Sequence, residues 1–280
     1  RLEVDGFKNL LEFAIDFGPF TCIAGENGAG KSNVFDAIDF LSLLADHSLM
    51  EAAQMVRSIG DGRMGDPRDL FWNGLRRDDL RMSLAVEMVV PKEVHDDFGR
   101  PATASITFLR YELTIGYEHP QGLERIGRLV LLREELRHIN LGDAAKHLRF
   151  PHSAKDFRGA VVSGRRTGVA FVSTEERPNG AVITIHQDGG SRGQPRPASA
   201  TKAPATVLST VTGAHDPTIL AARREMQSWR RLSLEPSALR TSDRYTDPRA
   251  MTASGRHLPA ALYRIAVDGD LGDRGDRKSV

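Results

Sequence analysis

The segment GENGAGKS, residues 25–32, combines residue types and spacing that can hold a nucleoside triphosphate. It fits the pattern G-x-x-x-x-G-K-[S/T], whose fixed positions are Gly25, Gly30, Lys31 and Ser32. Glycines let successive backbone N–H groups turn toward a phosphate, and a helix that follows adds the positive end of its dipole. In such a loop Lys31 reaches the outer phosphates as the catalytic cation, and the Ser32 hydroxyl is a metal ligand for Mg²⁺. The motif therefore predicts ATP and Mg²⁺ as cofactors.

A loop of this kind lies between a strand and a helix, so its flanking residues test the motif. The preceding run FTCIA, residues 20–24, is short and apolar and predicts a buried strand. Apolar residues at helical spacing then predict a helix; they are Val34, Phe35, Ile38, Leu41, Leu44 and Ala45. A glycine-rich turn with a chance lysine is the alternative, and it does not explain why all three signals occur together. The signals favour an α/β fold of the P-loop nucleoside triphosphatase type.

Length and composition limit the number of domains. A chain of 280 residues with 40% hydrophobic side chains can form one large domain or two ordinary ones. The formal net charge of +1 argues against a uniformly basic nucleic-acid binder, although a local basic patch is compatible with it. Cys22 is the only cysteine, which excludes a disulfide framework, and we expect it to be a small buried hydrophobe. The nine histidines show no paired metal-ligand spacing. No apolar run approaches the ~18 residues of a membrane span, so we expect no membrane contact and a cytoplasmic location.

Hydrophobic periodicity along the chain predicts two opening strands, a helix after the P-loop unit and then an antiparallel sheet. The expected sheet strands fall within 80–90, 104–118, 126–139, 168–176 and 180–188. Asp216 and Pro217 predict the start of a later helix, and a second one is expected within 255–267. We divide the chain into strands with the P-loop and its helix (1–46), a helix and loop leading into the sheet (47–100), an antiparallel β-rich region (101–186), a flexible linker (187–206), a helical segment (207–267) and a tail (268–280).

The motifs together resemble a known family. An opening strand with GFKNL, a second strand and then IAGENGAGKSNVFDAIDFL are similar to the amino-terminal half of an ABC-type ATPase of the SMC/RecF-like group. This group includes bacterial AAA-type ATP-binding proteins, some of them related to OLD-family defence proteins. The segments LSLEPSALR and ASGRHLPAALYRI are similar to the part that follows the inserted β-region in such proteins, so the resemblance reaches from Leu2 to about Val267. It implies an ABC-type head whose amino-terminal lobe carries an inserted antiparallel β-rich region and carboxy-terminal helices.

The resemblance also implies roles for particular residues. It places Lys8 and Asn9 where relatives contact the nucleotide from the side, while a solvated surface lysine is an equal alternative for Lys8. The resemblance further implies that the residues around the phosphates are Gly25, Glu26, Asn27, Gly28, Ala29, Gly30, Lys31, Ser32 and Asn33. We expect Asp36 to be a surface or packing group of the new helix. Phe71 and Trp72 could stack on a base or a partner, but burial under a loop is favoured because large aromatic side chains mostly serve cores.

Hydrolysis in this class needs an acidic residue after an apolar strand, a following glutamate and a signature segment of the L-S-x-G-x type. The sequence contains only near matches. LVLLREE, residues 129–135, has Arg133 at the position of the metal-side aspartate, and IAVDGD, residues 265–270, lacks the following glutamate. Segments 191–194 and 253–257 fail the signature, the first because prolines break the required helix and the second because its spacing is one residue short.

We therefore expect the amino-terminal portion of a longer ATPase that is incomplete for hydrolysis by itself. The alternatives are a nucleotide-sensing module that does not turn over ATP and a P-loop kinase, the latter disfavoured by the long β-rich block. The resemblance implies a homodimer with ATP sandwiched between heads, in a DNA-linked process such as repair or anti-phage defence, with DNA or a nuclease as partner. The arginines of ARREMQSWRRL could form a phosphate-binding patch on one helix, although a solvated helix face is favoured; they are Arg223, Arg224, Arg230 and Arg231.

Overall fold

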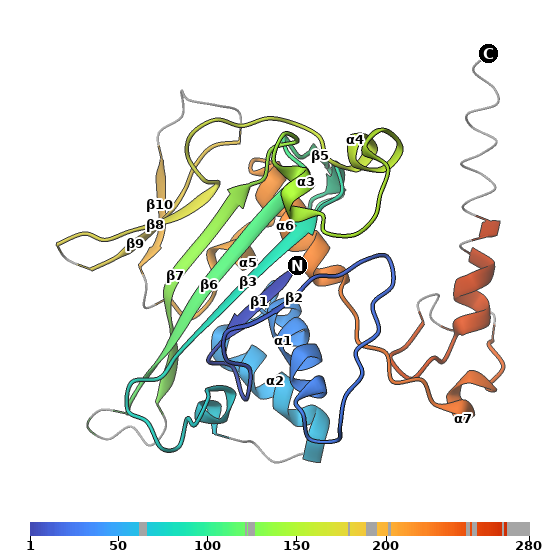
Figure 1. The fold of residues 1–280 in the computed structure, drawn as a ribbon, viewed down its shortest axis with the longest axis horizontal. Helices are drawn as coiled ribbons and strands as arrows, with labels where there is room; N and C mark the ends of the chain where they lie inside the picture. Colours follow the sequence, from blue (N-terminus) through green and yellow to red (C-terminus); the bar gives the residue numbers. More distant parts are fainter. Residues whose placement is uncertain are drawn as a thin grey trace. The chain divides into compact units, whose positions relative to one another are not determined.

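The structure is a computed structural model, shown in Figure 1. It describes residues 1–61, 66–120, 122, 127–178, 180–188, 195–200, 203–244, 247, 251–264 and 266–267. The chain divides into two compact units, Arg1–Trp229 and Arg230–Val280, and each is treated by itself below.

An antiparallel sheet of eight strands organises the first unit, in the order β10-β9-β8-β7-β6-β3-β1-β2. Its strands are β1 (Leu2–Asp5), β2 (Phe13–Ile15), β3 (Arg81–Val89), β6 (Phe108–Glu118), β7 (Arg128–His138), β8 (Val172–Glu175), β9 (Val182–Ile185) and β10 (Arg196–Ala200). A separate two-stranded sheet pairs β4 (Glu93–His95) with β5 (Pro101–Thr103). Figure 1 shows β3, β6 and β7 as the long central strands.

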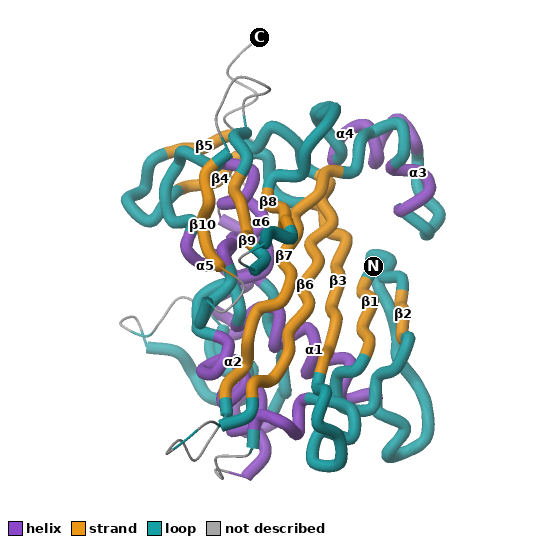
Figure 2. Tube along the Cα trace, turned by 90° about the vertical axis from the view of Figure 1, so that its left-hand side faces the viewer, coloured by secondary structure: helices purple, strands orange, loops and turns teal. Residues whose placement is uncertain are grey.

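Helices cover one face of this sheet, as Figure 2 shows. The main ones are α1 (Lys31–Leu43), α2 (Leu49–Asp61) and α6 (Pro217–Ser228), with the short α5 (Val207–Thr210) beside α6. Their apolar side chains join those of alternate strand residues in one core, because successive strand residues point to opposite faces. The remaining short helices of this unit are η1 (Pro67–Leu70), α3 (Ala144–His147), η2 (Ala154–Arg158) and α4 (Gly159–Val161).

The other face of the sheet carries charged side chains that pair with one another. Arg110 on β6 donates hydrogen bonds to Glu3 at 2.5 Å, to Glu87 at 3.0 Å and to Glu112 at 2.5 Å. The hydrogen bond from Arg110 lowers the pKa of Glu3 to about 2, although partial burial opposes the shift. Strand alternation thus places a row of ion pairs opposite the apolar core.

Most of the expected elements form where the periodicity predicts them. The five β-rich runs contain β3, β6, β7, β8 and β9, the opening strands are β1 and β2, and a helix starts at Pro217. Asp216 precedes that helix, but its side chain accepts a hydrogen bond from Arg196 instead of capping the helix. Phe71 is buried, as expected, whereas Trp72 is only half-buried and lies under the guanidinium group of Arg77. The segment 187–206 is not all linker, because residues 196–200 form β10 and pair with β9.

The expected strand before the P-loop is wrong. Residues 20–24 form no strand, the Phe20 side chain is 88% exposed, and Cys22 is exposed rather than buried. An apolar run becomes a strand only when a neighbouring strand takes up its N–H and C=O groups. Among the described residues the sheet ends at β2, so the segment has no neighbour to pair with.

The second unit contains α7 (Pro236–Leu239) and a helical stretch over residues 258–264. This stretch lies within the range 255–267 in which the sequence predicts a helix. The tail, 268–280, and the near match at 191–194 lie outside the described residues, as does most of the near match at 265–270.

Candidate nucleotide site

The P-loop leads directly into α1 and leaves the amino end of that helix open. Gly28 and Gly30 have φ values of 87° and 91°, in the left-handed region that favours glycine. Gly30 is the N-cap residue, no side chain caps the helix, and its first turn contains no acidic residue. The first N–H groups of a helix have no partner within the helix, so this end can bind an anion. Residues 24–29 and Ser32 are exposed and therefore accessible to a ligand.

Lys31 turns back into the loop that precedes it. Its Nζ donates hydrogen bonds to the carbonyl oxygens of Gly25 and Glu26, both at 2.6 Å. The ammonium group is thus held within the concave side of the loop. A cation there is suited to neutralising phosphate oxygens that enter the loop.

The turn between β1 and β2 lies against the same helix. Asn9 accepts a hydrogen bond from the Asn33 side chain at 2.7 Å, and a Cβ added to Gly30 would overlap the Asn9 side chain. Lys8 forms an ion pair with Asp36 at 2.5 Å and points to the helix rather than to the loop. Of the residues selected from the sequence, the structure brings Asn9 together with Gly30 and Asn33. Asp36 has a specific partner that the sequence did not reveal.

The two glutamates of the near match 129–135 have structural partners, Glu134 in the core and Glu135 in ion pairs with Arg133 and Arg137. Glu134 on β7 is fully buried and accepts hydrogen bonds from the N–H groups of Val207 at 2.6 Å and Leu208 at 2.9 Å, and from the Tyr111 hydroxyl at 2.9 Å. Burial raises the pKa of the Glu134 carboxyl, and these three hydrogen bonds oppose the rise. Since its oxygens are occupied at the start of α5, Glu134 is a helix-capping group and not a water-activating one.

The prediction that one helix carries four arginines is wrong, because only two of them lie on α6. Helix α6 ends at Ser228, so Arg230 and Arg231 are not on it. Arg223 is buried and donates to the Ala45 carbonyl at 3.0 Å, and Arg224 pairs with Asp97 at 2.5 Å. Neither the phosphate-binding patch nor the solvated face forms on α6, because its arginines link α6 to neighbouring segments.

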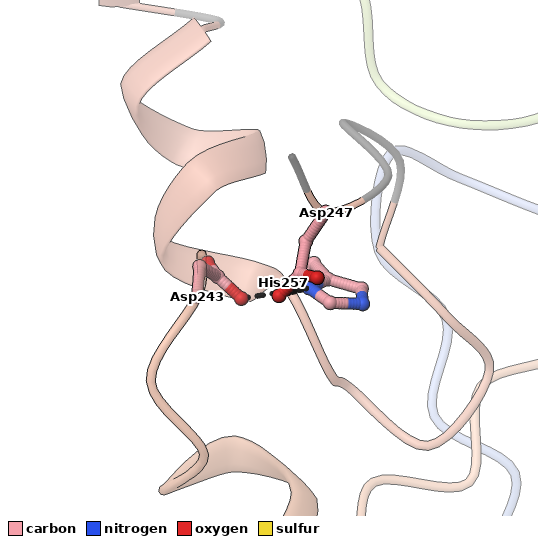
Figure 3. A group of neighbouring side chains, drawn as sticks. All are labelled: Asp243, Asp247 and His257. Atoms are coloured by element: carbon pink, nitrogen blue, oxygen red, sulfur yellow. Dashed lines mark hydrogen bonds and ion pairs between the residues drawn. The ribbon is translucent and has the colours of Figure 1, made fainter. Parts of the chain in front are cut away.

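The second unit holds a cluster of Asp243, Asp247 and His257, shown in Figure 3. One possible ligand atom from each lies within 4.8 Å of the others, and His257 is buried. His257 Nδ1 lies 2.7 Å from an Asp243 oxygen, and the second Asp243 oxygen accepts a hydrogen bond from the Ala260 N–H at 3.1 Å. The sequence missed this group because its spacing is irregular. These contacts anchor the helical stretch 258–264 at its amino end.

Comparison with known proteins agrees with the position of the P-loop. A family model described as an AAA domain matches residues 1–43. The DNA replication and repair protein RecF of Parabacteroides distasonis is 37% identical over 62 residues, which are 22% of this chain and 17% of that protein. The proteins of that name from Phocaeicola vulgatus and Nocardioides sp. are 29% and 34% identical over 87 and 62 residues, or 28% and 22% of this chain.

These matches are partial. They cover 17%, 23% and 15% of the three relatives' own lengths, and no solved structure matches the chain significantly. Within the part of the chain that the structure describes, no helix is both long and apolar enough to cross a bilayer. The family-model match, residues 1–43, nevertheless includes the P-loop motif together with β1, β2 and α1. The amino-terminal portion of this chain is therefore similar to AAA domains and to a part of RecF proteins, as the resemblance to the SMC/RecF-like group implies.

Proposed function

We propose that this chain binds Mg²⁺-ATP at the P-loop and belongs to an ATPase that works in a DNA-linked process. The observation that carries the proposal is the uncapped amino end of α1, preceded by two left-handed glycines and by Lys31 turned into the loop. In the bound state Gly25 to Asn33 surround the phosphates, Lys31 neutralises their charge, and Ser32 is a ligand of Mg²⁺. Asn9 and Lys8 support the site from the side of the β1–β2 turn, Asn9 at Gly30 and Lys8 through its ion pair with Asp36.

We further propose that hydrolysis requires groups beyond those beside this P-loop. The Glu134 carboxylate is occupied by α5, and Glu135 pairs with Arg133 at 2.6 Å and Arg137 at 2.5 Å. A homodimer that sandwiches ATP between two heads would supply such groups. Closure on ATP and reopening after hydrolysis would then drive an event on DNA, such as repair or defence against phage, in the cytoplasm with DNA or a nuclease as partner.

Nucleotide binding is tested with a fluorescent ATP analogue and Mg²⁺, titrated against the wild type and Lys31→Ala. We expect Lys31→Ala to weaken binding at least about tenfold, the factor that corresponds to ~1.4 kcal/mol of lost charge-assisted contacts. Lys146→Ala is the matched control, since this lysine is 77% exposed and pairs only with Asp143 among the described contacts. Equal affinity of the wild type and Lys31→Ala would refute the proposed site.

Phosphate release by the same proteins tests the second part of the proposal. We expect this chain to bind ATP without measurable turnover, and turnover to begin only when additional sequence or a second head is supplied. Persistent absence of turnover in a dimer would favour the nucleotide-sensing alternative. Lys31-dependent hydrolysis by the isolated monomer would contradict the need for further groups.

A further inference from the structure

Two side-chain contacts join the β1–β2 turn to the first two turns of α1. Lys8 Nζ lies 2.5 Å from Asp36 Oδ2, and Asn33 Nδ2 donates to Asn9 Oδ1 at 2.7 Å. We infer that the Lys8–Asp36 pair is a brace that positions the P-loop helix, and that Lys8 supports nucleotide binding through Asp36 without touching the nucleotide. This inference rests on the proposed nucleotide site and names residues that hold it in place.

The turn can act as a rigid support because the core fixes it. The Lys8 N–H donates to the Leu70 carbonyl at 2.7 Å, and the Trp72 N–H donates to the Gly6 carbonyl at 2.9 Å. Gly6 has a φ of 75°, and a Cβ there would lie 2.6 Å from the Arg81 carbonyl oxygen, so only glycine fits. The main chain on both sides of Lys8 is therefore held by hydrogen bonds and close packing.

Phe7 anchors the turn further. It is fully buried and stacks on Phe40 of α1 with ring centroids 5.9 Å apart. Lys8 itself has a φ of 49°, an uncommon conformation for a residue other than glycine. Such a backbone persists where the surroundings determine it, and here it directs the Lys8 side chain onto α1.

The ion pair is partly buried, which makes it more than a surface contact. The side chains of Lys8 and Asp36 are 20% and 15% exposed. Removing one partner leaves a charge with reduced access to water, so each single substitution should disturb the helix. Asp36 lies four residues beyond Ser32, which is about 6 Å along a helix axis. The Lys8 ammonium is thus held beside the second turn of α1 and acts on the helix.

The P-loop receives this support at Gly30. The Asn9 side chain fills the space where a Cβ of Gly30 would lie, and Asn33 holds Asn9 in that position. Val34, Ala37 and Phe40 of α1 are buried, and the brace adds polar contacts between α1 and the turn to this packing. A shift of α1 of about 1 Å would misplace the N–H groups that face the phosphates, and misplacement on that scale is costly for a preorganised site.

The test is a charge exchange measured by binding of a fluorescent ATP analogue with Mg²⁺. We expect Lys8→Met and Asp36→Asn each to weaken binding about five- to tenfold, and the double variant to be no weaker than either single one, because both remove the same contact. The exchanged variant, Lys8→Asp with Asp36→Lys, should regain affinity within about twofold of the wild type, since it restores the pair with opposite polarity. Lys146→Met is the control and should bind as the wild type does.

A different pattern would overturn the brace. If Lys8 contacts the nucleotide, Asp36→Asn will bind nearly normally, the losses in the double variant will add, and the exchanged variant will bind as poorly as Lys8→Met. Urea unfolding monitored by far-UV circular dichroism checks that each variant is folded. If Asp36→Asn is unfolded before the titration, Asp36→Ser takes its place.

The two proposals fail in different ways. A wild type that binds ATP in a Lys31-dependent manner, with Lys8 and Asp36 variants that bind normally, would reject only the brace. A wild type that does not bind ATP would reject the nucleotide site and the brace together.

Discussion

At the level of single residues, the structure uses charged side chains mainly to hold its own elements together. Arg110 joins Glu3 of β1 to Glu87 of β3 and Glu112 of β6, so one guanidinium spans three strands. Arg223 does the same for α6 and the end of α1. Planar guanidinium groups suit such sites because they donate several hydrogen bonds in fixed directions.

The lowered pKa of Glu3 makes the stability of the fold depend on acid pH. The pKa of Glu3 is about 2 in the folded protein, against an ordinary value of 4.5, so the unfolded chain binds the proton more readily. The stabilisation by the Glu3–Arg110 pair is therefore complete above pH 4.5 and is lost as the pH falls toward about 2. We expect the urea midpoint to fall more steeply over this range for the wild type than for Glu3→Gln.

The control for this prediction is Glu175→Gln, which removes an exposed carboxylate that pairs with Arg177 at 3.1 Å. Exposed pairs of this kind contribute little to stability, so the pH dependence of this variant should match that of the wild type. Parallel curves for Glu3→Gln and the wild type would show that Glu3 does not carry the effect.

At the level of elements, residues 20–24 show that an apolar composition alone does not produce a strand. These residues have the composition of a buried strand but lack a partner strand, whereas the helix α1 that follows them forms fully. A helix satisfies its hydrogen bonds internally, but a strand depends on its neighbours. Ile23 still contacts the core, which keeps the segment beside α1.

Cys22 reports on this segment, since it is the only cysteine in the chain and is exposed. We expect the native protein to react with Ellman's reagent at one thiol per chain, at a rate close to that in urea, because an accessible thiol needs no unfolding to react. Cys22→Ser should not react. A thiol that is protected until urea is added would mean that residues 20–24 form a buried strand after all.

At the level of the whole molecule, the chain is two units of unequal size. The core of residues 1–229 draws on the sheet and on α1, α2, α5 and α6, while the described part of the second unit has few buried apolar side chains. Trp229 contacts this core, and its carbonyl accepts a hydrogen bond from Ser42 at 3.3 Å. The core of the first unit is therefore complete at Trp229.

This organisation predicts that a chain ending at Trp229 folds by itself. We expect it to keep the far-UV circular dichroism of a mixed α/β protein and a single cooperative urea transition. A chain ending at Val211 is the control, because it lacks α6, whose Ile219, Leu220 and Met226 are buried. If removal of residues 230–280 abolished the transition, the first unit would not be an independent folding unit.

The sequence by itself determined the features that depend on local pattern. Alternation of apolar and polar residues predicted the strands of the large sheet, and helical spacing predicted α1, α2 and α6. The glycines and lysine of residues 25–31 identified the P-loop because phosphate binding by backbone N–H groups needs those residue types in consecutive positions. The family resemblance followed from the same local motifs.

Only the tertiary structure decided which partners the charged and apolar groups find. Glu134 lies in a segment that only nearly matches a hydrolytic motif, and α5 takes up its oxygens. Arg223 was expected on a solvated helix face, yet it is buried and donates to the Ala45 carbonyl just after α1. Two further features depend on partners that the fold supplies or withholds: residues 20–24 find no partner strand, and Lys8 finds Asp36. Hydrogen bonds and ion pairs between residues far apart in the chain depend on packing, and packing is set by the whole fold rather than by local sequence.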